Sequence, residues 1–222
     1  MQRNRLNRGL FRLIPRALLL ALILLPATSG VAQAAITQLV FITTAQPITA
    51  GEASEIMTIQ TQDDGYEPAD VAADTTINLS STSAQGKFSL SAVSWVDITS
   101  VTITNGSNSV SFYYKDTTAG GPTITAEDDP NGYTGGVWID DTQPQTIDPA
   151  SLHHFTLSNI STQTAGTAFS ITITAEDEFF NTATSYTGPN SLSDTTGTIL
   201  PTTTGDFIAG VWADIVTITK AQ

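Results

Sequence analysis

Apolar and hydroxyl residues alternate along short stretches of the chain. Met57-Thr58-Ile59-Gln60-Thr61 places every second residue on one face, and Phe169-Ser170-Ile171-Thr172-Ile173-Thr174-Ala175 repeats the pattern. Side chains of a β-strand point alternately to the two faces of a sheet, so each stretch has one face for a core and one for solvent. No stretch keeps the spacing of an amphipathic helix. The pattern predicts an all-β chain.

Gly, Pro, Asn and Asp separate these stretches at intervals of roughly 8–12 residues, which favours immunoglobulin-like antiparallel sandwiches. Asn105-Gly106 predicts a hairpin that pairs the strands on either side of it. The expected strands are Leu39–Ile42, Met57–Thr61, Thr76–Ser80, Phe88–Leu90, Val101–Thr104, Val110–Tyr114, Pro122–Ala126, His154–Leu157, Phe169–Ala175, Ser191–Ser193 and Ile215–Thr219.

The chain contains an internal repeat. Thr164-Ala165-Gly166 precedes the second alternating stretch, which ends at Asp177, and Thr49-Ala50-Gly51 precedes the first, which ends at Asp63. A repeat of this length indicates two copies of one β unit. We expect one sandwich over residues 35–148, with an acidic C-terminal segment, and a second over residues 149–222.

Short motifs in both units resemble a known family. Thr164-Ala165-Gly166, Ile171-Thr172-Ile173-Thr174 and Gly210-Val211-Trp212 leading into Val216-Thr217-Ile218-Thr219 resemble the bacterial immunoglobulin-like (Big or invasin-type) repeats found in tandem in secreted and cell-surface proteins. Such repeats carry Asp-x-x-Gly-Asn after the second strand. Here Asp177-Glu178-Phe179-Phe180-Asn181 has Phe at the Gly position, and Asp63-Asp64-Gly65-Tyr66-Glu67 has Gly one position early. The resemblance implies a spacer, adhesin or accessory module without catalysis.

The second unit is expected to be incomplete. Aligning Val101–Thr104 with Val216–Thr219 leaves no counterpart for Val110–Tyr114 or Pro122–Ala126. An alternative alignment, which pairs Lys220 with Lys115, loses only the later strand. Either alignment predicts an unpaired sheet edge, which invites pairing with another chain. The unit is then a fragment of a longer repeat protein, or is completed by a partner strand.

The first 34 residues have the pattern of a signal peptide. Five arginines precede an apolar run over Ala17–Leu25, and Ala32-Gln33-Ala34 supplies the small residues of a cleavage site. The alternative is an uncleaved membrane anchor, but a span needs about 20 apolar residues. Arg16 and Pro26 bracket a shorter run. We therefore expect a secreted or cell-surface protein that is not inserted in a membrane after cleavage.

Removal of residues 1–34 changes the charge of the chain. The remaining chain has three lysines against 21 acidic residues, a net charge of −18. Nucleic acid is therefore excluded as an expected partner, because phosphate binding needs clustered Lys and Arg. The chain has no Cys, which excludes disulfides, thiolate metal sites and a lipidated Cys.

The acidic segment of the first unit contains a partial calcium motif. Glu127, Asp129 and Asn131 occupy ligand positions of a calcium loop, followed by Gly132. Position twelve is Trp138 rather than Glu, and Asp140 and Asp141 are the substitutes just beyond it. The segment is either an interdomain calcium site or an ordinary Asn-Gly turn in an acidic loop. We expect no other cofactor.

Each of the three tryptophans is followed two positions later by an aspartate. The pairs are Trp95-Asp97, Trp138-Asp140 and Trp212-Asp214. On a strand, both members of a pair share a face. Exposed, they would form a platform for a sugar ring with a hydrogen-bonding acid; buried, each Trp caps the core while its Asp reaches water.

Nucleophilic catalysis is not expected. His153 and His154 are the only histidines, and adjacent strand residues point to opposite faces, so the two are expected not to converge. Neither a Gly-x-Ser-x-Gly elbow nor a His-Glu-x-x-His motif is present. With 21 acidic residues, a chance pair of carboxylates in a glycosidase-like cleft is harder to exclude.

The sequence thus predicts a non-catalytic structural or adhesive module. Its expected partners are neighbouring immunoglobulin-like repeats or other surface proteins. The alternative function is a carbohydrate-binding accessory module that uses Trp95, Trp138 and Trp212 on polysaccharide. Solvent exposure of the three indoles distinguishes the two.

Export is expected to remove residues 1–34, because the basic, apolar and small-residue regions follow one another in signal-peptide order. N-terminal sequencing of the exported protein should begin at Ala35. Intact Met1 protein recovered from the membrane fraction would contradict the assignment.

Overall fold

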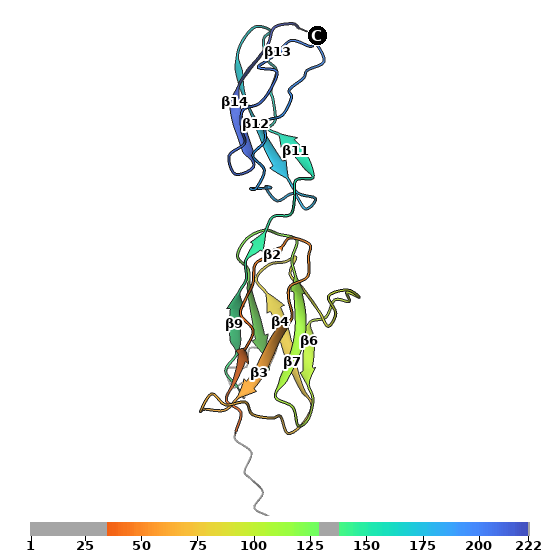
Figure 1. Cartoon of the computed structure of the whole chain (residues 1–222), viewed down its shortest axis with the longest axis vertical. Coiled ribbons are helices and arrows are strands. Elements are labelled where there is room, and N and C mark those ends of the chain that lie inside the picture. The colour runs from red at the N-terminus through yellow and green to blue at the C-terminus, as the bar shows by residue number, and fades with distance from the viewer. Residues whose placement is uncertain (1–34, 129–137, 222) are drawn as a thin grey trace, which may run out of the picture. The chain divides into compact units, whose positions relative to one another are not determined.

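The computed structural model describes residues 35–128 and 138–221. Every element in these ranges is a β-strand, as Figure 1 shows, so the predicted all-β class is confirmed. The described residues accordingly contain no helix long and apolar enough to cross a membrane. The predicted signal peptide lies outside the described residues.

The first module consists of two four-stranded sheets. One has the order β1 (Gln38–Phe41), β3 (Met57–Gln62), β7 (Ser109–Lys115), β5 (Lys87–Ser89), and the other β6 (Ser100–Ile103), β4 (Thr75–Ser81), β8 (Thr123–Glu127), β9 (Asp141–Pro144). All pairs within them are antiparallel, whereas β2 (Ile48–Thr49) pairs with β10 (Ile147–Asp148) in parallel. This is the ABED and CFG arrangement of an immunoglobulin-like sandwich, with β6 as an additional edge strand.

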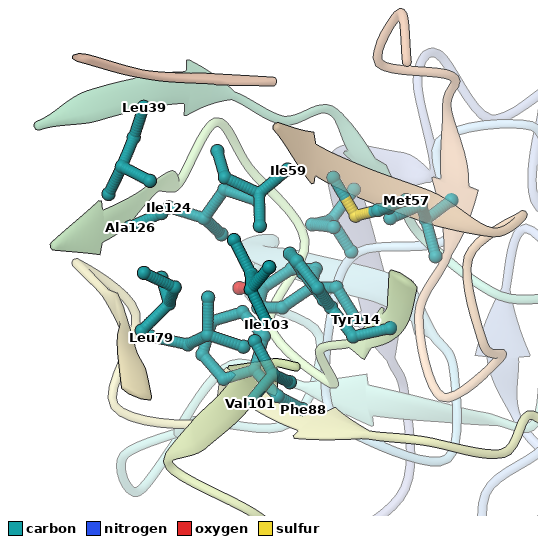
Figure 2. Packing of buried hydrophobic residues seen from close by; sticks show 14 of the residues in the cluster. Leu39, Met57, Ile59, Leu79, Phe88, Val101, Ile103, Tyr114, Ile124 and Ala126 are labelled. Atoms are coloured by element: carbon teal, nitrogen blue, oxygen red, sulfur yellow. The ribbon is translucent and has the colours of Figure 1, made fainter. Parts of the chain in front are cut away.

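Alternating burial produces the core of the first module. In β3, Met57, Ile59 and Thr61 are buried while the residues between them are not. The facing sheet also buries alternate residues, namely Ile77 and Leu79 of β4 and Ile124 and Ala126 of β8. Figure 2 shows Met57, Ile59, Leu79, Ile124 and Ala126 among the side chains that meet between the sheets. The predicted inward faces are confirmed, except that Leu90, expected beside Phe88, is 64% exposed.

A buried polar pair closes this core. Tyr114 is fully buried, and its hydroxyl donates to Asp116 Oδ2 at 2.7 Å and contacts Ser81 Oγ at 2.9 Å. Burial raises the pKa of the Tyr114 phenol, so it stays a hydrogen-bond donor. Asp116 is itself fully buried, and its other oxygen accepts from the amide of Thr118 at 2.8 Å.

The hairpin predicted at Asn105-Gly106 is wrong. β6 pairs with β4, whereas β7 pairs with β3 and β5, so the turn carries the chain from one sheet to the other. The acidic segment after Glu127 ends in β9 and β10, two strands of the first sandwich that were not among the expected strands.

The second module has one well-formed sheet. Its order is β11 (His154–Leu157), β12 (Phe169–Glu176), β14 (Val211–Ile218), β13 (Ile199–Leu200). Opposite it, the strand predicted at Ser191–Ser193 makes only an isolated bridge from Ser191 to Thr203. Phe155, Tyr186 and Phe207 contact one another at centroid distances of 5.1 to 5.6 Å and cover one end of the buried cluster.

Register identifies the equivalent strands of the two modules. β14 pairs with β12 as β7 pairs with β3, and Gly166 N donates to Ile218 O as Gly51 N donates to Asp116 O. The alignment of Val216–Thr219 with Val101–Thr104 is therefore wrong, and the alternative is closer. Within the described part of the second module, no strand occupies the place of β8, β9 or β10.

The second module is expected to be digested first in limited proteolysis. Its cluster has seven buried members against sixteen in the first, so local opening should cost less free energy. With a nonspecific protease, we expect cleavage within residues 151–222 about tenfold faster than within residues 35–148. Equal rates in a demonstrated monomer would contradict the inference.

Candidate functional site

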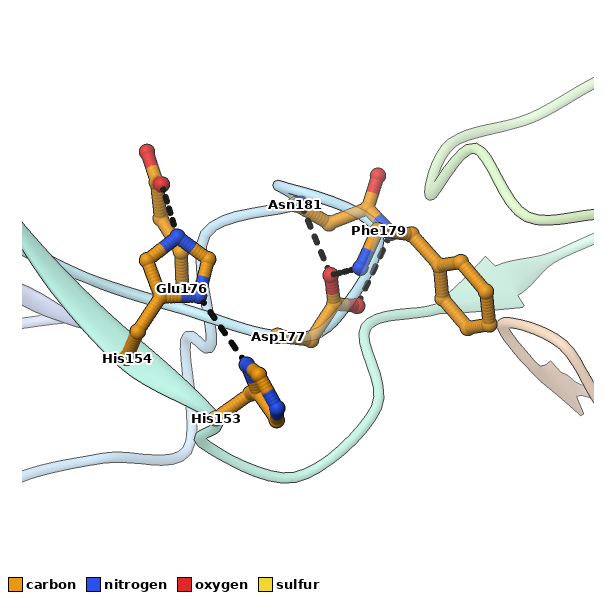
Figure 3. A network of polar contacts seen from close by, with 6 residues as sticks. All are labelled: His153, His154, Glu176, Asp177, Phe179 and Asn181. Carbon is orange, nitrogen blue, oxygen red and sulfur yellow. Dashed lines mark hydrogen bonds and ion pairs between the residues drawn. The ribbon is translucent and has the colours of Figure 1, made fainter.

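The turn after β12, residues 177–181, is built on one buried carboxylate. Asp177 is fully buried, and its Oδ1 accepts from the amides of Phe179 and Asn181 at 2.9 and 2.8 Å. Its Oδ2 accepts from Asn181 Nδ2 at 2.8 Å and from the amide of Ala150 at 2.9 Å. Figure 3 shows Asp177 and Asn181 facing each other across the turn. We call residues 177–181 the docking turn.

Hydrogen bonding outweighs burial at this carboxylate. Burial alone would raise the pKa of Asp177, but the side chain of Asn181 and the amides of Asn181, Ala150 and Phe179 all donate to the ionised form. The pKa is therefore lowered below its ordinary value of 3.8. Asp177 thus holds the docking turn as an anion at neutral pH.

The turn needs a left-handed residue, and neither module uses Gly there. Phe180 has φ of 67° and Tyr66, at the equivalent place after β3, has φ of 63°. A bulky residue in this region is strained by roughly 1–2 kcal/mol. The hydrogen bonds from residues 179 and 181 to Asp177 help to offset that cost. Phe180 also packs edge-on against His154 at a centroid distance of 5.0 Å.

Asn181 links the docking turn to the first module. Its Nδ2 donates to the carbonyl of Thr117 and its Oδ1 accepts from the amide of Ala119, both at 2.8 Å. Since Nδ2 also donates to Asp177, both amide groups of the side chain are used. One side chain therefore joins the turn of one module to the backbone of the other.

Phe179 makes the apolar half of the same contact. Its ring packs against the hydrophobic cluster of the first module, next to Gly51. A Cβ at Gly51 would lie 2.5 Å from the ring, and φ of 85° at this residue also favours Gly. Gly51 is thus required both by its turn and by the ring that covers it. At the equivalent Gly166, a Cβ would meet nothing within 4 Å.

The two histidines are closer together than predicted. His153 Nδ1 lies 3.3 Å from His154 Nδ1, and His154 Nε2 lies 3.1 Å from Glu176 Oε2 (Figure 3). The prediction that they point apart is wrong, because β11 begins at His154 and His153 is not constrained by strand alternation. Nevertheless, no group of three or more His, Asp or Glu able to hold a metal occurs among the described residues.

The described residues of the predicted calcium segment do not lie at the module junction. Leu39 N donates to Ile139 O, which places the residue before Asp140 beside the first strand of the chain. Asp141 accepts from the amides of Phe41 and Thr142, Glu127 ends β8, and Asp140 is exposed. Asp129 and Asn131 lie outside the described residues. Glu127, Asp140 and Asp141 are therefore not at the junction, and calcium binding stays a prediction.

The three indoles do not form an exposed row. Trp212 is 5% exposed, and Trp138 packs partly buried against the first core. Lys115 Nζ lies 4.3 Å from the ring centroid of Trp95, whose indole N–H donates to Asp97 Oδ1 at 2.7 Å. The indole and carboxylate of this pair are thus in contact, although both residues lie outside the strands. Trp212 has no free face for a sugar, so the platform with three members is wrong.

Sequence reasoning did not identify Asn181 and Phe179 as contact residues. The signal was present, because Asp and Asn at the ends of the docking turn match the family motif and Gly51 lies in the repeated Thr-Ala-Gly turn. The partners of Asn181 in the first module are more than 60 positions away in sequence. The motif alone therefore indicates a turn and not what the turn contacts.

Comparison with known proteins gives only remote likenesses. No protein-family model and no protein of curated function matches the chain. Similar solved structures include domains 4 and 5 of the S-layer protein SbsC, with 12% identity over 50% of this chain and 51% of that one and a TM-score of 0.33. The Yersinia pseudotuberculosis adhesin InvE is 16% identical over 81% of this chain and 51% of that one, with a TM-score of 0.37.

Invasin, a bacterial integrin-binding protein, is 14% identical over 83% of this chain and 34% of that one, with a TM-score of 0.34. The chain thus spans about half or less of the length of these proteins. Likenesses of this size establish neither a shared family nor a shared function.

Replacing Asp177 with Asn should lower the free energy of unfolding by about 1–3 kcal/mol at pH 7. The new NH2 group would face Ala150 N and Asn181 Nδ2, two donors whose hydrogen bonds Oδ2 now accepts. Asp63→Asn is the matched control. Asp63 accepts from Gly65 N and Glu67 N through Oδ1 alone, which Asn retains, so the loss should stay within about 0.5 kcal/mol.

The Asp177 effect should depend on pH. The folded-state pKa is lowered, so its stabilisation is present above the unfolded value near 3.8 and is lost as pH falls through the folded value. Denaturant unfolding at several pH values measures the difference between wild type and Asp177→Asn. A difference that persists unchanged below the folded pKa would contradict the assignment.

Proposed function

We propose that the chain is a non-catalytic structural module of a secreted or cell-surface protein, in which the docking turn fixes one sandwich against the next. The observation that carries this is the pair of hydrogen bonds from Asn181 to Thr117 and Ala119. A flexible linker would need no such contact. A spacer that holds its neighbours at a set angle does need one.

The buried acids support a structural role over a catalytic one. Asp116 and Asp177 are fully buried, and their hydrogen-bond partners are groups that hold turns and strand ends. A catalytic carboxylate instead faces a cleft where substrate can reach it. These two acids contribute to the architecture of the modules.

Charge and the N-terminal pattern support an extracellular location. The chain beyond residue 34 carries −18, which favours solubility and a self-repelling surface. The partners that suit such a module are neighbouring repeats and other surface proteins. Trp212 is buried, so a platform of three exposed indoles has no support, and no carbohydrate-binding role is proposed.

The test measures the distance between spin labels on the two modules. The chain has no native Cys, so Thr76→Cys and Ala213→Cys, both at exposed positions, give two unique sites. We expect a narrow distribution of distances in this background. Adding Phe179→Ala and Asn181→Ala should broaden it about twofold or more, since ring and amide contacts are both removed.

Asn108→Ala is the control, because Asn108 donates to Asp70 within the first module. It should leave the distribution unchanged. A wild-type distribution as broad as that of the double variant would overturn the proposal.

A further inference from the structure

An exposed apolar loop joins β5 to β6 in the first module. Leu90, Val93 and Val96 are 64%, 94% and 68% exposed, and no charged residue occurs from Leu90 to Val96. In Figure 1 it is the yellow-green loop that projects from the side of the module. Large apolar side chains gathered on one exposed loop are typical of an interaction surface. We call residues 90–97 the apolar loop.

Hydrogen bonds hold the apolar loop in one conformation. The hydroxyl of Ser89, which is 1% exposed, accepts from the amides of Ser91 and Val96, both at 3.2 Å. The hydroxyl of Ser91 accepts from the amides of Val93 and Ser94 at 3.3 and 3.0 Å. The apolar side chains are thus presented to solvent by an ordered backbone. A preformed loop loses less conformational entropy when it binds.

Two of the three lysines beyond residue 34 lie beside the apolar loop. Lys87 and Lys115 are direct partners across β5 and β7, so their side chains share one face of the sheet. Lys115 Nζ also lies over the ring of Trp95, which belongs to the loop. Neither lysine forms an ion pair with a carboxylate in the described part of the chain. Like charges directly opposite each other destabilise a sheet, so a bound carboxylate would relieve a cost.

The turn after β3, residues 63–67, has the complementary chemistry. Tyr66 is 74% exposed, and Asp64 and Glu67 are exposed close to it. Phe180, the counterpart of Tyr66 in the docking turn, packs against His154, whereas no ring among the described residues contacts Tyr66. An aromatic ring with two carboxylates beside it therefore faces solvent. We call residues 63–67 the acidic turn.

The two surfaces lie too far apart to meet within one chain. Gln60 pairs with Ser109, so the acidic turn follows β3 at that end of β7, whereas Lys87 pairs with Lys115 at the other end. Ser109 and Lys115 are the first and last residues of β7, about 20 Å apart at the usual rise per residue. The acidic turn can therefore reach an apolar loop only on another molecule.

We propose that the apolar loop of one copy of this chain binds the acidic turn of a second copy. The ring of Tyr66 packs against Val93 and Val96 of the other copy. The two carboxylates beside the ring then face Lys87 and Lys115. Each copy contributes a different surface, so the contact is heterologous and copies associate head to tail. Both surfaces lie away from the docking turn, and the inference does not depend on the proposed function.

Sedimentation velocity of the exported protein tests the contact. At about 0.15 M salt the Debye length is about 8 Å, so the net charge of −18 repels only at short range while opposite charges in contact still attract. We expect association with a Kd of about 100 μM or tighter. Val93→Asp, which would bury an unpaired charge, and Tyr66→Asn, which removes the ring, should each raise the Kd at least about tenfold.

Both variants should fold. Val93 and Tyr66 are exposed, and Asn tolerates the left-handed backbone at residue 66. Ile208→Asp is the matched control, because Ile208 is an apolar residue of the second module that is 81% exposed. It should associate as the wild type does.

A mixture of the two variants distinguishes a head-to-tail contact from other association. The Tyr66→Asn copy keeps its apolar loop and the Val93→Asp copy keeps its acidic turn. The mixture should therefore form a dimer with about the wild-type Kd, although each variant alone associates about tenfold more weakly. A monomeric wild type at about 1 mM, wild-type association of Val93→Asp, loss of association in Ile208→Asp, or no dimer in the mixture would overturn the proposal.

Discussion

A buried carboxylate must have hydrogen bonds, and the junction between the modules depends on how Asp177 obtains them. Four donors reach its two oxygens, from the docking turn itself and from Ala150 at the start of the second module. These bonds fix Asn181 and Phe179 at their observed places. Contact with the first module then follows without further adjustment of the turn.

The docking turn has a counterpart in the first module, but only the docking turn makes a contact between modules. After β3, residues 63–67 repeat the backbone of the docking turn, including a bulky left-handed residue. However, Gly65 stands where Phe179 stands, and Glu67 where Asn181 stands. The turn is therefore a common element of the repeat. Two side chains convert it from a chain reversal into a contact between modules.

Local pattern predicted the strands well because alternation is a property of each strand alone. β3 and β12 were identified from their own residues, and their inward faces agree with the observed burial. Asn105-Gly106 indicated a reversal, but a turn sequence carries no information about which sheet the next strand joins. The contacts of Asn181 could not be predicted for a related reason, since they depend on the packing of two separate modules.

The histidine pair shows that side-chain directions predicted from strand alternation are unreliable at the end of a strand. His153 precedes the strand, which begins at His154 as predicted, so the alternation rule does not apply to it and the two rings meet. The Trp-x-Asp pairs show that the spacing of two residues does not predict whether they are buried. Their spacing was read correctly, but burial of Trp212 depends on residues distant in sequence that cover it.

The parallel pairing of β2 with β10 gives the first module a mechanical property. If tension is applied to the chain on either side of this module, β1 is the first strand reached from one end and β10 from the other. Because β2 and β10 run in the same direction, such a pull makes them slide past each other rather than peel apart. The hydrogen bonds of Ile48 to Thr146 and of Ala50 to Asp148 are then strained together. A protein that tethers partners at a surface under flow would benefit from this shear geometry.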